Sequence, residues 1–117
     1  MDFLSNTCVG CYLFDYTGFI RFFKENNNVV VWGLGEWGKV LYLFMDNLKI
    51  HADYYVDINC ENIDSSFYGH IEIMKSLKSD EKKITVLATN TNISQYLKSD
   101  ASYNMHKIVS LNDIFDN

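Results

Sequence analysis

The strongest constraint on the fold is one stretch where β-favouring residues meet three spaced glycines and a helical pattern. Residues 29–32 read Val-Val-Val-Trp, and Gly33, Gly35 and Gly38 follow as a G-x-G-x-x-G. Apolar residues then recur at helical spacing over 36–48. A strand before the glycines and a helix after them separate a functional turn from a chance glycine cluster. The chain is therefore predicted to contain a tight strand–turn–helix unit.

Each glycine has a physical role in such a turn. Gly33 lets the chain leave the strand sharply, Gly35 lets a phosphate approach the backbone, and Gly38 lets the helix lie close to the strand. Backbone N–H groups at the start of the helix face the bound anion. The predicted phosphate-binding segment comprises Gly33, Leu34, Gly35, Glu36, Trp37 and Gly38.

Other candidate site residues follow two predicted strands. Asp57 ends the alternating run 50–57, at the place where an acid can bind ribose hydroxyls. The run 84–89 is almost continuously β-favouring, which is typical of a buried parallel strand. Thr89 and Asn90 come at its end, on the edge where open parallel sheets bind ligands. The alternative reading is that these polar residues cap the next helix.

The remaining patterns predict an α/β fold. In chain order they indicate a helix at 17–24, a strand at 29–32, a helix at 36–48, a strand at 50–57, a short strand at 68–73, one or two helical turns at 74–78, a strand at 84–89, a helix from an N-cap at Asn92 to about Ser99, a strand at 107–109 and a terminal helix through Phe115. We expect a small doubly wound parallel sheet, with helices on both faces and 29–32 between 52–56 and 84–89.

Two side-chain patterns carry finer predictions. Trp37, Val40, Leu41, Phe44 and Leu48 are expected to form the helix stripe that faces the sheet. Trp37 either stacks on a bound base or, as we favour, packs on the helix at 17–24. In the run 50–57, alternating residues are expected to leave one face of the strand less covered than in the first strand.

Length, charge and cysteine content limit the functions that the chain can have. The 117 residues fit one domain, without room for a separate substrate domain. A formal charge of −5 argues against nucleic-acid binding. No apolar run reaches the ~18 residues of a membrane span and no signal peptide is visible, so we expect a cytoplasmic protein. Three cysteines without a zinc-ligand pattern are interpreted as ordinary reduced thiols.

No catalytic group can be assembled from the sequence. Tyr103 and Lys107 share the Y-x-x-x-K spacing of the catalytic pair in short-chain dehydrogenases. That pair needs a single helix, whereas Lys107 begins a predicted strand, so we interpret the spacing as coincidence. The chain is therefore more readily understood as a binding module than as an enzyme on its own.

The motifs together resemble a known family. Residues 29–37, the run Tyr-Val-Asp-Ile-Asn at 55–59, Gly-His-Ile-Glu-Ile at 69–73 and the closing 108–115 are similar to small Rossmann-like domains that accompany bacterial sugar-modifying enzymes. Related domains occur in sugar acetyltransferases, glycosyltransferases and methyltransferases of polysaccharide synthesis. The resemblance implies a Rossmann-like nucleotide-binding domain over 19–117, preceded by an N-terminal arm at 1–18. The β-helix repeats that carry acetyl transfer in those acetyltransferases are missing, so transferase activity is not implied.

The resemblance also implies a ligand and partners. Its glycines would hold the phosphates of NAD(P) or a nucleotide sugar, and Asp57 would meet the ribose. An acid there favours NAD or a UDP-type sugar over NADP. The module would serve sugar or surface-polysaccharide biosynthesis beside a separate sugar-modifying enzyme. The alternative is a ligand-free structural or regulatory subunit.

We also expect a homo-oligomer. The aromatic N-terminal arm and the surplus apolar face of the helix at 36–48 would otherwise expose a large apolar patch.

Overall fold

The computed structural model describes residues 16–69, 71–78 and 82–115. Its elements, in chain order, are α2 (Tyr16–Glu25), β1 (Val29–Trp32), α3 (Glu36–Leu48), β2 (Tyr54–Val56), two 3₁₀ turns η1 (Cys60–Asn62) and η2 (Ser65–Tyr68), β3 (Ile73–Met74), β4 (Thr85–Ala88), α4 (Thr91–Ser99), a third 3₁₀ turn η3 (Ala101–Tyr103), β5 (Lys107–Ser110) and α5 (Leu111–Phe115). Most of the predicted N-terminal arm, residues 1–15, lies outside the described residues.

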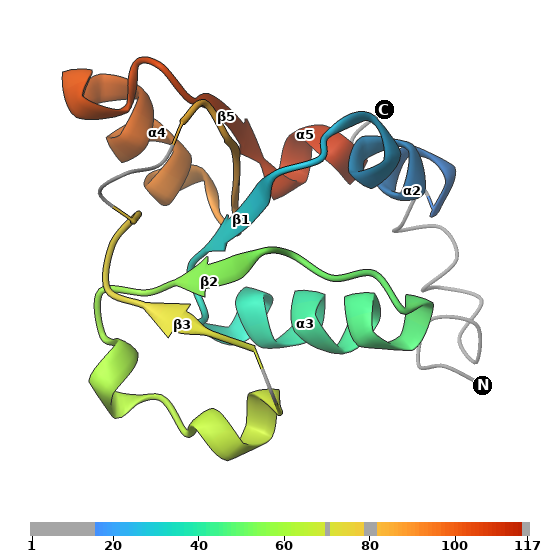
Figure 1. Ribbon diagram of the computed structural model, residues 1–117. Coiled ribbons are helices and arrows are strands. Elements are labelled where there is room, and N and C mark those ends of the chain that lie inside the picture. Colours follow the sequence, from blue (N-terminus) through green and yellow to red (C-terminus); the bar gives the residue numbers. More distant parts are fainter. Residues whose placement is uncertain (1–15, 70, 79–81, 116–117) are drawn as a thin grey trace.

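The five strands form one all-parallel sheet in the order β3-β2-β1-β4-β5 (Figure 1). In the register, Val31 of β1 lies between Tyr55 of β2 and Leu87 of β4. The strand order therefore reverses beside β1, as in a doubly wound sheet. This arrangement confirms the predicted fold class and the central place of residues 29–32.

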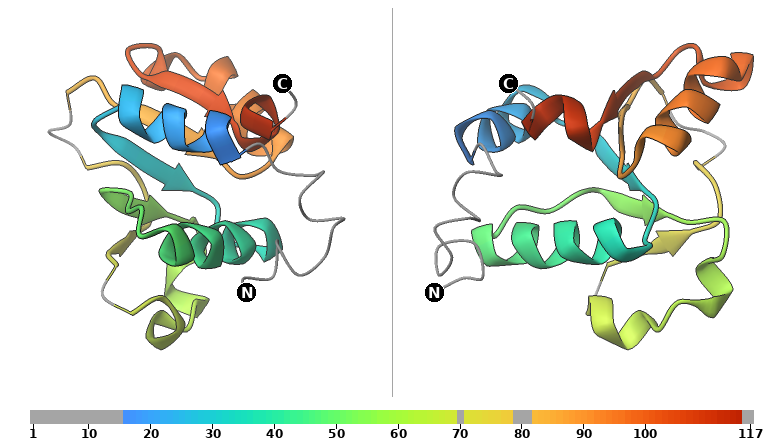
Figure 2. Two further views of the ribbon diagram at one scale, coloured as in Figure 1. Left: turned by 90° about the vertical axis from the view of Figure 1, so that its right-hand side faces the viewer. Right: turned by 180° about the vertical axis from the view of Figure 1, so that it is seen from behind.

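Helices cover both faces of the sheet (Figure 2). On one face, α2, α3 and α5 pack on alternate strand residues that include Val29, Val31 and Leu87. On the other face, Leu97 of α4 packs with Val30 and other strand residues. Successive strand residues point to opposite faces, so the fully buried β1 contributes to both cores.

The second strand differs from the prediction in length and cover. Regular pairing is limited to Tyr54–Val56, and all three residues are buried. Tyr54 and Val56 face the α4 side while Tyr55 faces the α3 side, so the predicted alternation is present. The prediction of a less covered face was wrong for the paired residues, because Tyr55 is buried on the α3 side and Tyr54 and Val56 are buried with Met74 and Leu77 on the other, whereas His51 and Asp53 before the strand are exposed as the alternation indicated.

The bounds of several short elements also differ from the predicted ones. β3 begins at Ile73, later than predicted, and residues 75–78 form no helix. α4 starts at Thr91 with Asn90 as its N-cap, so the predicted cap at Asn92 was wrong. The Oδ1 atom of Asn90 accepts a hydrogen bond from the N–H of Ile93 at 2.9 Å. This is the capping geometry that satisfies one of the first N–H groups of a helix.

The buried face of α3 is rotated from the predicted stripe. Its buried residues are Gly38, Leu41, Phe44 and Met45, whereas Trp37 is 60% exposed. The favoured prediction that Trp37 packs on α2 was therefore wrong. Gly38 replaces it in the stripe because only a residue without a side chain lets the helix approach β1 this closely. No helix of the described part of the chain is long and apolar enough to cross a membrane.

Candidate functional site

The glycine turn leaves the carboxyl end of β1 in a conformation that requires glycine. Gly33 has a φ of 110°, which side-chain-bearing residues rarely adopt, and its N–H donates to the carbonyl of Val56 at 2.7 Å. A Cβ at this position would overlap Thr89 Oγ1 and lie 2.6 Å from Ile93 Cδ1. The turn is therefore in contact with the ends of both neighbouring strands, β2 and β4.

Gly38 and Gly35 differ in the space that a side chain would have. A Cβ on Gly38 would overlap the carbonyl oxygen of Gly33 and reach 3.0 Å from its carbon. Gly35, the N-cap of α3, has a φ of −74°, and a Cβ there would meet nothing within 4 Å. The fold therefore requires glycine at 33 and 38 but not at 35. Open space above an exposed glycine is what an approaching ligand would use.

The start of α3 offers N–H groups to an anion. The first N–H groups of a helix lack partners within the helix, and the helix dipole adds a partial positive charge. A glycine N-cap has no side chain that could accept from them. Glu36 in the first turn is exposed and has a carboxylate that suits the dipole but repels a phosphate held at the same end.

Asp57 connects the turn to the end of β2. Its Oδ2 atom accepts from the N–H of Leu34 at 2.7 Å, and its Oδ1 atom accepts from the N–H of Asn59 at 2.8 Å. The predicted ribose-binding acid therefore lies beside the glycine turn, as the sequence indicated. Asp57 also fixes the backbone of the turn through these hydrogen bonds, a role that was not predicted from the sequence. A carboxylate has about four acceptor positions, so two bonds leave capacity for a ligand hydroxyl.

The other predicted site residues divide between the interior and the surface. Thr89 is 4% exposed, and its Oγ1 atom lies 3.1 Å from the carbonyl oxygen of Gly33, to which it donates. Its hydroxyl is thus used to hold the turn. Leu34 is also buried, and its side chain belongs to the core on the α3 side. Asn90 is exposed and caps α4, while Trp37 is exposed beside the turn.

An apolar cavity adjoins the turn at the same sheet edge. Its volume is about 630 Å³, and Trp32, Ile58, Tyr96 and Tyr103 line it together with Lys75, Ser76, Asn92 and Ile93. Ile93 connects the cavity to the turn. Its side chain lines the cavity and also lies close to Gly33, since a Cβ on that glycine would contact it. The Trp32 and Tyr103 rings pack edge to face with centroids 5.6 Å apart. Burial raises the pKa of Tyr103 above its ordinary value, with Tyr96 and Asp100 adding to the shift.

Sequence reasoning missed this aromatic cavity. A signal was present, because Trp32 ends the central strand one residue before Gly33 and so had to lie at the ligand-binding edge. Tyr96 and Tyr103 belong to α4 and η3, whose packing above that edge is a tertiary property. Lys75, which follows β3 at this edge, supplies a positive charge that the predictions did not include.

The described residues contain no cluster of three potential metal ligands. Tyr103 lies in η3 and Lys107 is the first residue of β5, which confirms that their spacing is not that of one catalytic helix. No family model, no characterised protein and no solved structure matches the chain. Function is therefore inferred from the geometry of the site.

Proposed function

We propose that the chain is a nucleotide-binding module, with NAD or a UDP-type nucleotide sugar as ligand. The proposal extends to a role in bacterial sugar or surface-polysaccharide biosynthesis, beside a separate sugar-modifying enzyme, on the strength of the sequence resemblance. It concerns binding and assigns no catalytic residue.

The observation that carries the proposal is the open space above Gly35. Gly35 lies at the reversal point of a doubly wound sheet, where such folds bind their ligands. Open space lies above it, and neither its φ nor a neighbouring atom requires glycine. A phosphate at this place would meet the N–H groups of Glu36 and Trp37 without hindrance from a side chain.

The adjoining cavity supports the other half of a nucleotide. Its aromatic wall of Trp32, Tyr96 and Tyr103 suits a flat base, because bases stack on aromatic side chains. Its volume of about 630 Å³ lies within the range of ordinary small-molecule sites. Lys75 at the rim could neutralise part of the phosphate charge.

Asp57 supports a choice among nucleotides. Its remaining acceptor capacity suits a 2′,3′-diol, whereas its negative charge would repel a 2′-phosphate. We therefore propose that NAD and UDP-sugars bind better than NADP.

A ligand-free structural or regulatory subunit is the second candidate, and one observation favours it. The carboxylates of Glu36 and Asp57 both lie at the glycine turn, and Asp57 occupies the N–H of Leu34. The N–H of Leu34 is thus already hydrogen-bonded and does not bind phosphate, and the other N–H groups of the turn lie near two negative charges.

Titration calorimetry with NAD and UDP-glucose separates the two candidates. Gly35→Val places a branched side chain in the open space and should abolish binding, while leaving the fold intact. Glu36→Gln removes one repelling charge and should tighten binding severalfold. Glu61→Gln, an equal charge change in η1, serves as the control and should leave affinity unchanged. If neither NAD nor UDP-glucose gives binding heat with the wild-type protein, the ligand-free subunit is favoured.

A further inference from the structure

Tyr68, the last residue of η2, carries a buried hydroxyl to which no described residue is hydrogen-bonded. The residue is 1% exposed, so water does not reach the hydroxyl in place of a protein partner. Buried polar groups are almost always hydrogen-bonded, because an unpaired one has lost its bonds to water without replacing them. The Tyr68 hydroxyl therefore calls for an explanation.

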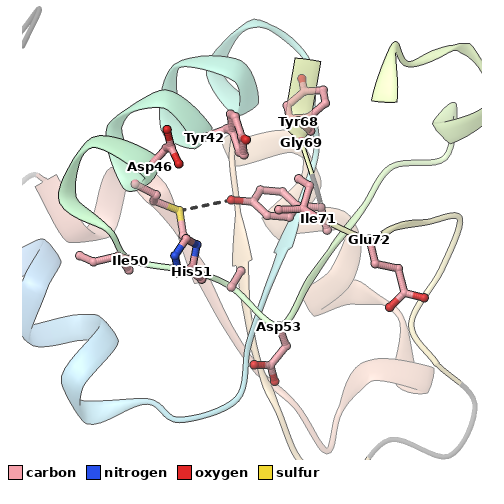
Figure 3. Close-up of a pocket in the computed structure, with 12 residues that line it drawn as sticks. Tyr42, Asp46, Ile50, His51, Asp53, Tyr68, Gly69, Ile71 and Glu72 are labelled. Carbon is pink, nitrogen blue, oxygen red and sulfur yellow. Dashed lines mark hydrogen bonds between the residues drawn. The ribbon is translucent and has the colours of Figure 1, made fainter. Parts of the chain in front are cut away.

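Aromatic packing fixes the direction of the Tyr68 side chain. Its ring lies edge to face with the rings of Tyr42 on α3 and of Phe67, each with centroids 4.9 Å away. Figure 3 shows Tyr68 at the border of a pocket beside α3, with its hydroxyl directed away from His51 and Asp53. The hydroxyl therefore does not serve that pocket, and its function depends on the groups on its other side.

The carboxylate of Asp57 is close to the Tyr68 hydroxyl. The N–H of Asp57 donates to the carbonyl of Met74 at 2.9 Å, so residue 57 continues the pairing of β2 beyond Val56. Alternation along the strand places the Asp57 side chain on the α3 side of the sheet, where Tyr55 and Tyr68 also lie. Burial raises the pKa of Tyr68, and the charge of the Asp57 carboxylate adds to the shift, as expected for neighbouring groups.

Asp57 can accept more hydrogen bonds than it receives from the turn. One of its oxygens accepts from the N–H of Leu34 and the other from the N–H of Asn59. Since a carboxylate has about four acceptor positions, each oxygen keeps one. The Tyr68 hydroxyl is thus a donor without an acceptor, beside an acceptor with spare capacity, and no hydrogen bond joins the two in this structure.

We propose that Tyr68 is a positioning residue of the glycine-turn site, whose hydroxyl donates to Asp57 when this carboxylate binds the diol of a ribose. The inference rests on the proposed nucleotide-binding function, and it names ribose-bearing ligands as the class that this pair recognises. Asp57 is half-buried, so a diol can reach it from the open side and turn the carboxylate toward Tyr68. The hydrogen bond that is unmade in the free protein then forms in the complex, and its free energy adds to affinity.

Titration calorimetry of Tyr68→Phe with NAD and with UDP-glucose tests the proposal, together with thermal denaturation of the ligand-free protein. Phenylalanine keeps the ring and removes only the hydroxyl. Affinity for a nucleotide that binds the wild type should fall about tenfold, or about 1.4 kcal/mol, because the complex loses one hydrogen bond. The melting temperature should equal that of the wild type or exceed it, because an unpaired buried group has been removed. A role in packing alone would lower both quantities.

Tyr42→Phe is the matched control, because it removes the same atom from the neighbouring ring. Burial and, after it, the Asp46 carboxylate raise the pKa of Tyr42, so the acidic neighbour of its hydroxyl is Asp46. This variant should keep the wild-type affinity. In a double-mutant cycle, Tyr68→Phe should change the affinity of Asp57→Asn by less than about twofold, because the hydroxyl acts through the carboxylate.

Equal nucleotide affinity of Tyr68→Phe and wild type would overturn the proposal and leave nucleotide binding in place. An equal loss in Tyr42→Phe would also overturn it, as would a full tenfold effect of Tyr68→Phe in the Asp57→Asn background. If the wild type binds neither nucleotide, the nucleotide-binding function fails and the role of Tyr68 fails with it.

Discussion

Replacing Gly38 by alanine tests the account of the glycine turn through stability alone. The new Cβ would overlap the carbonyl oxygen of Gly33, reach 3.0 Å from the carbonyl carbon and lie 3.3 Å from Leu34 Cδ2. Two of these contacts involve backbone, so α3 must move away from β1. Overpacking of this kind costs about 3 kcal/mol, and the higher helix propensity of alanine returns about 1 kcal/mol. The expected net loss is about 2 kcal/mol.

Such a loss lowers the melting temperature by about 10 °C in a domain of this size. Thermal and urea denaturation, followed by circular dichroism, measure it. Gly35→Ala is the control, because its Cβ meets nothing within 4 Å, and it should change stability by less than about 1 kcal/mol. Equal stability of Gly38→Ala and wild type would show that α3 does not approach β1 closely enough at this position to exclude a side chain.

Three further outcomes are expected. Asn90→Ala removes the cap of α4 and should cost about 1 kcal/mol in urea denaturation, and a cost near zero would deny the cap its role. Hydrogen bonds from Ser102 to Asp100 hold the pKa of this exposed carboxyl below its usual value in the folded state, so its stabilising contribution should be present at neutral pH and disappear as the pH falls below about 4. Acid denaturation of Asp100→Ala should therefore be shallower than that of the wild type, and identical curves would speak against the contribution. The chain should form a dimer or larger assembly, and light scattering that gives a 13.6 kDa particle at tens of micromolar would contradict this.

The sequence predicted the fold class and the sheet order because strong local signals agree with each other. Val29–Trp32 is fully buried and pairs in parallel with β2 and β4, as expected where helices connect successive strands. The boundaries of α3 were also predicted correctly, since Gly35 before it and Leu48 at its end frame an apolar stretch.

What the sequence did not predict depends on tertiary packing. Trp37 has the right spacing for the buried stripe, but the close approach at Gly38 rotates it outward. Asn90 and Asn92 are both good N-cap residues, and only the position where β4 ends decides between them. The aromatic cavity joins residues from β1, α4 and η3, and no local pattern connects such distant positions.

Amide resonances of the glycine turn give the most direct test of the central claim that a nucleotide binds there. In a titration with NAD, and separately with UDP-glucose, we expect at least one nucleotide to shift the amides of Gly35, Glu36 and Trp37. The amide of Arg21 on α2 should remain unchanged, because that helix lies beside α5, away from the turn. Unshifted glycine-turn amides with both nucleotides, or shifts confined to other parts of the chain, would contradict the account.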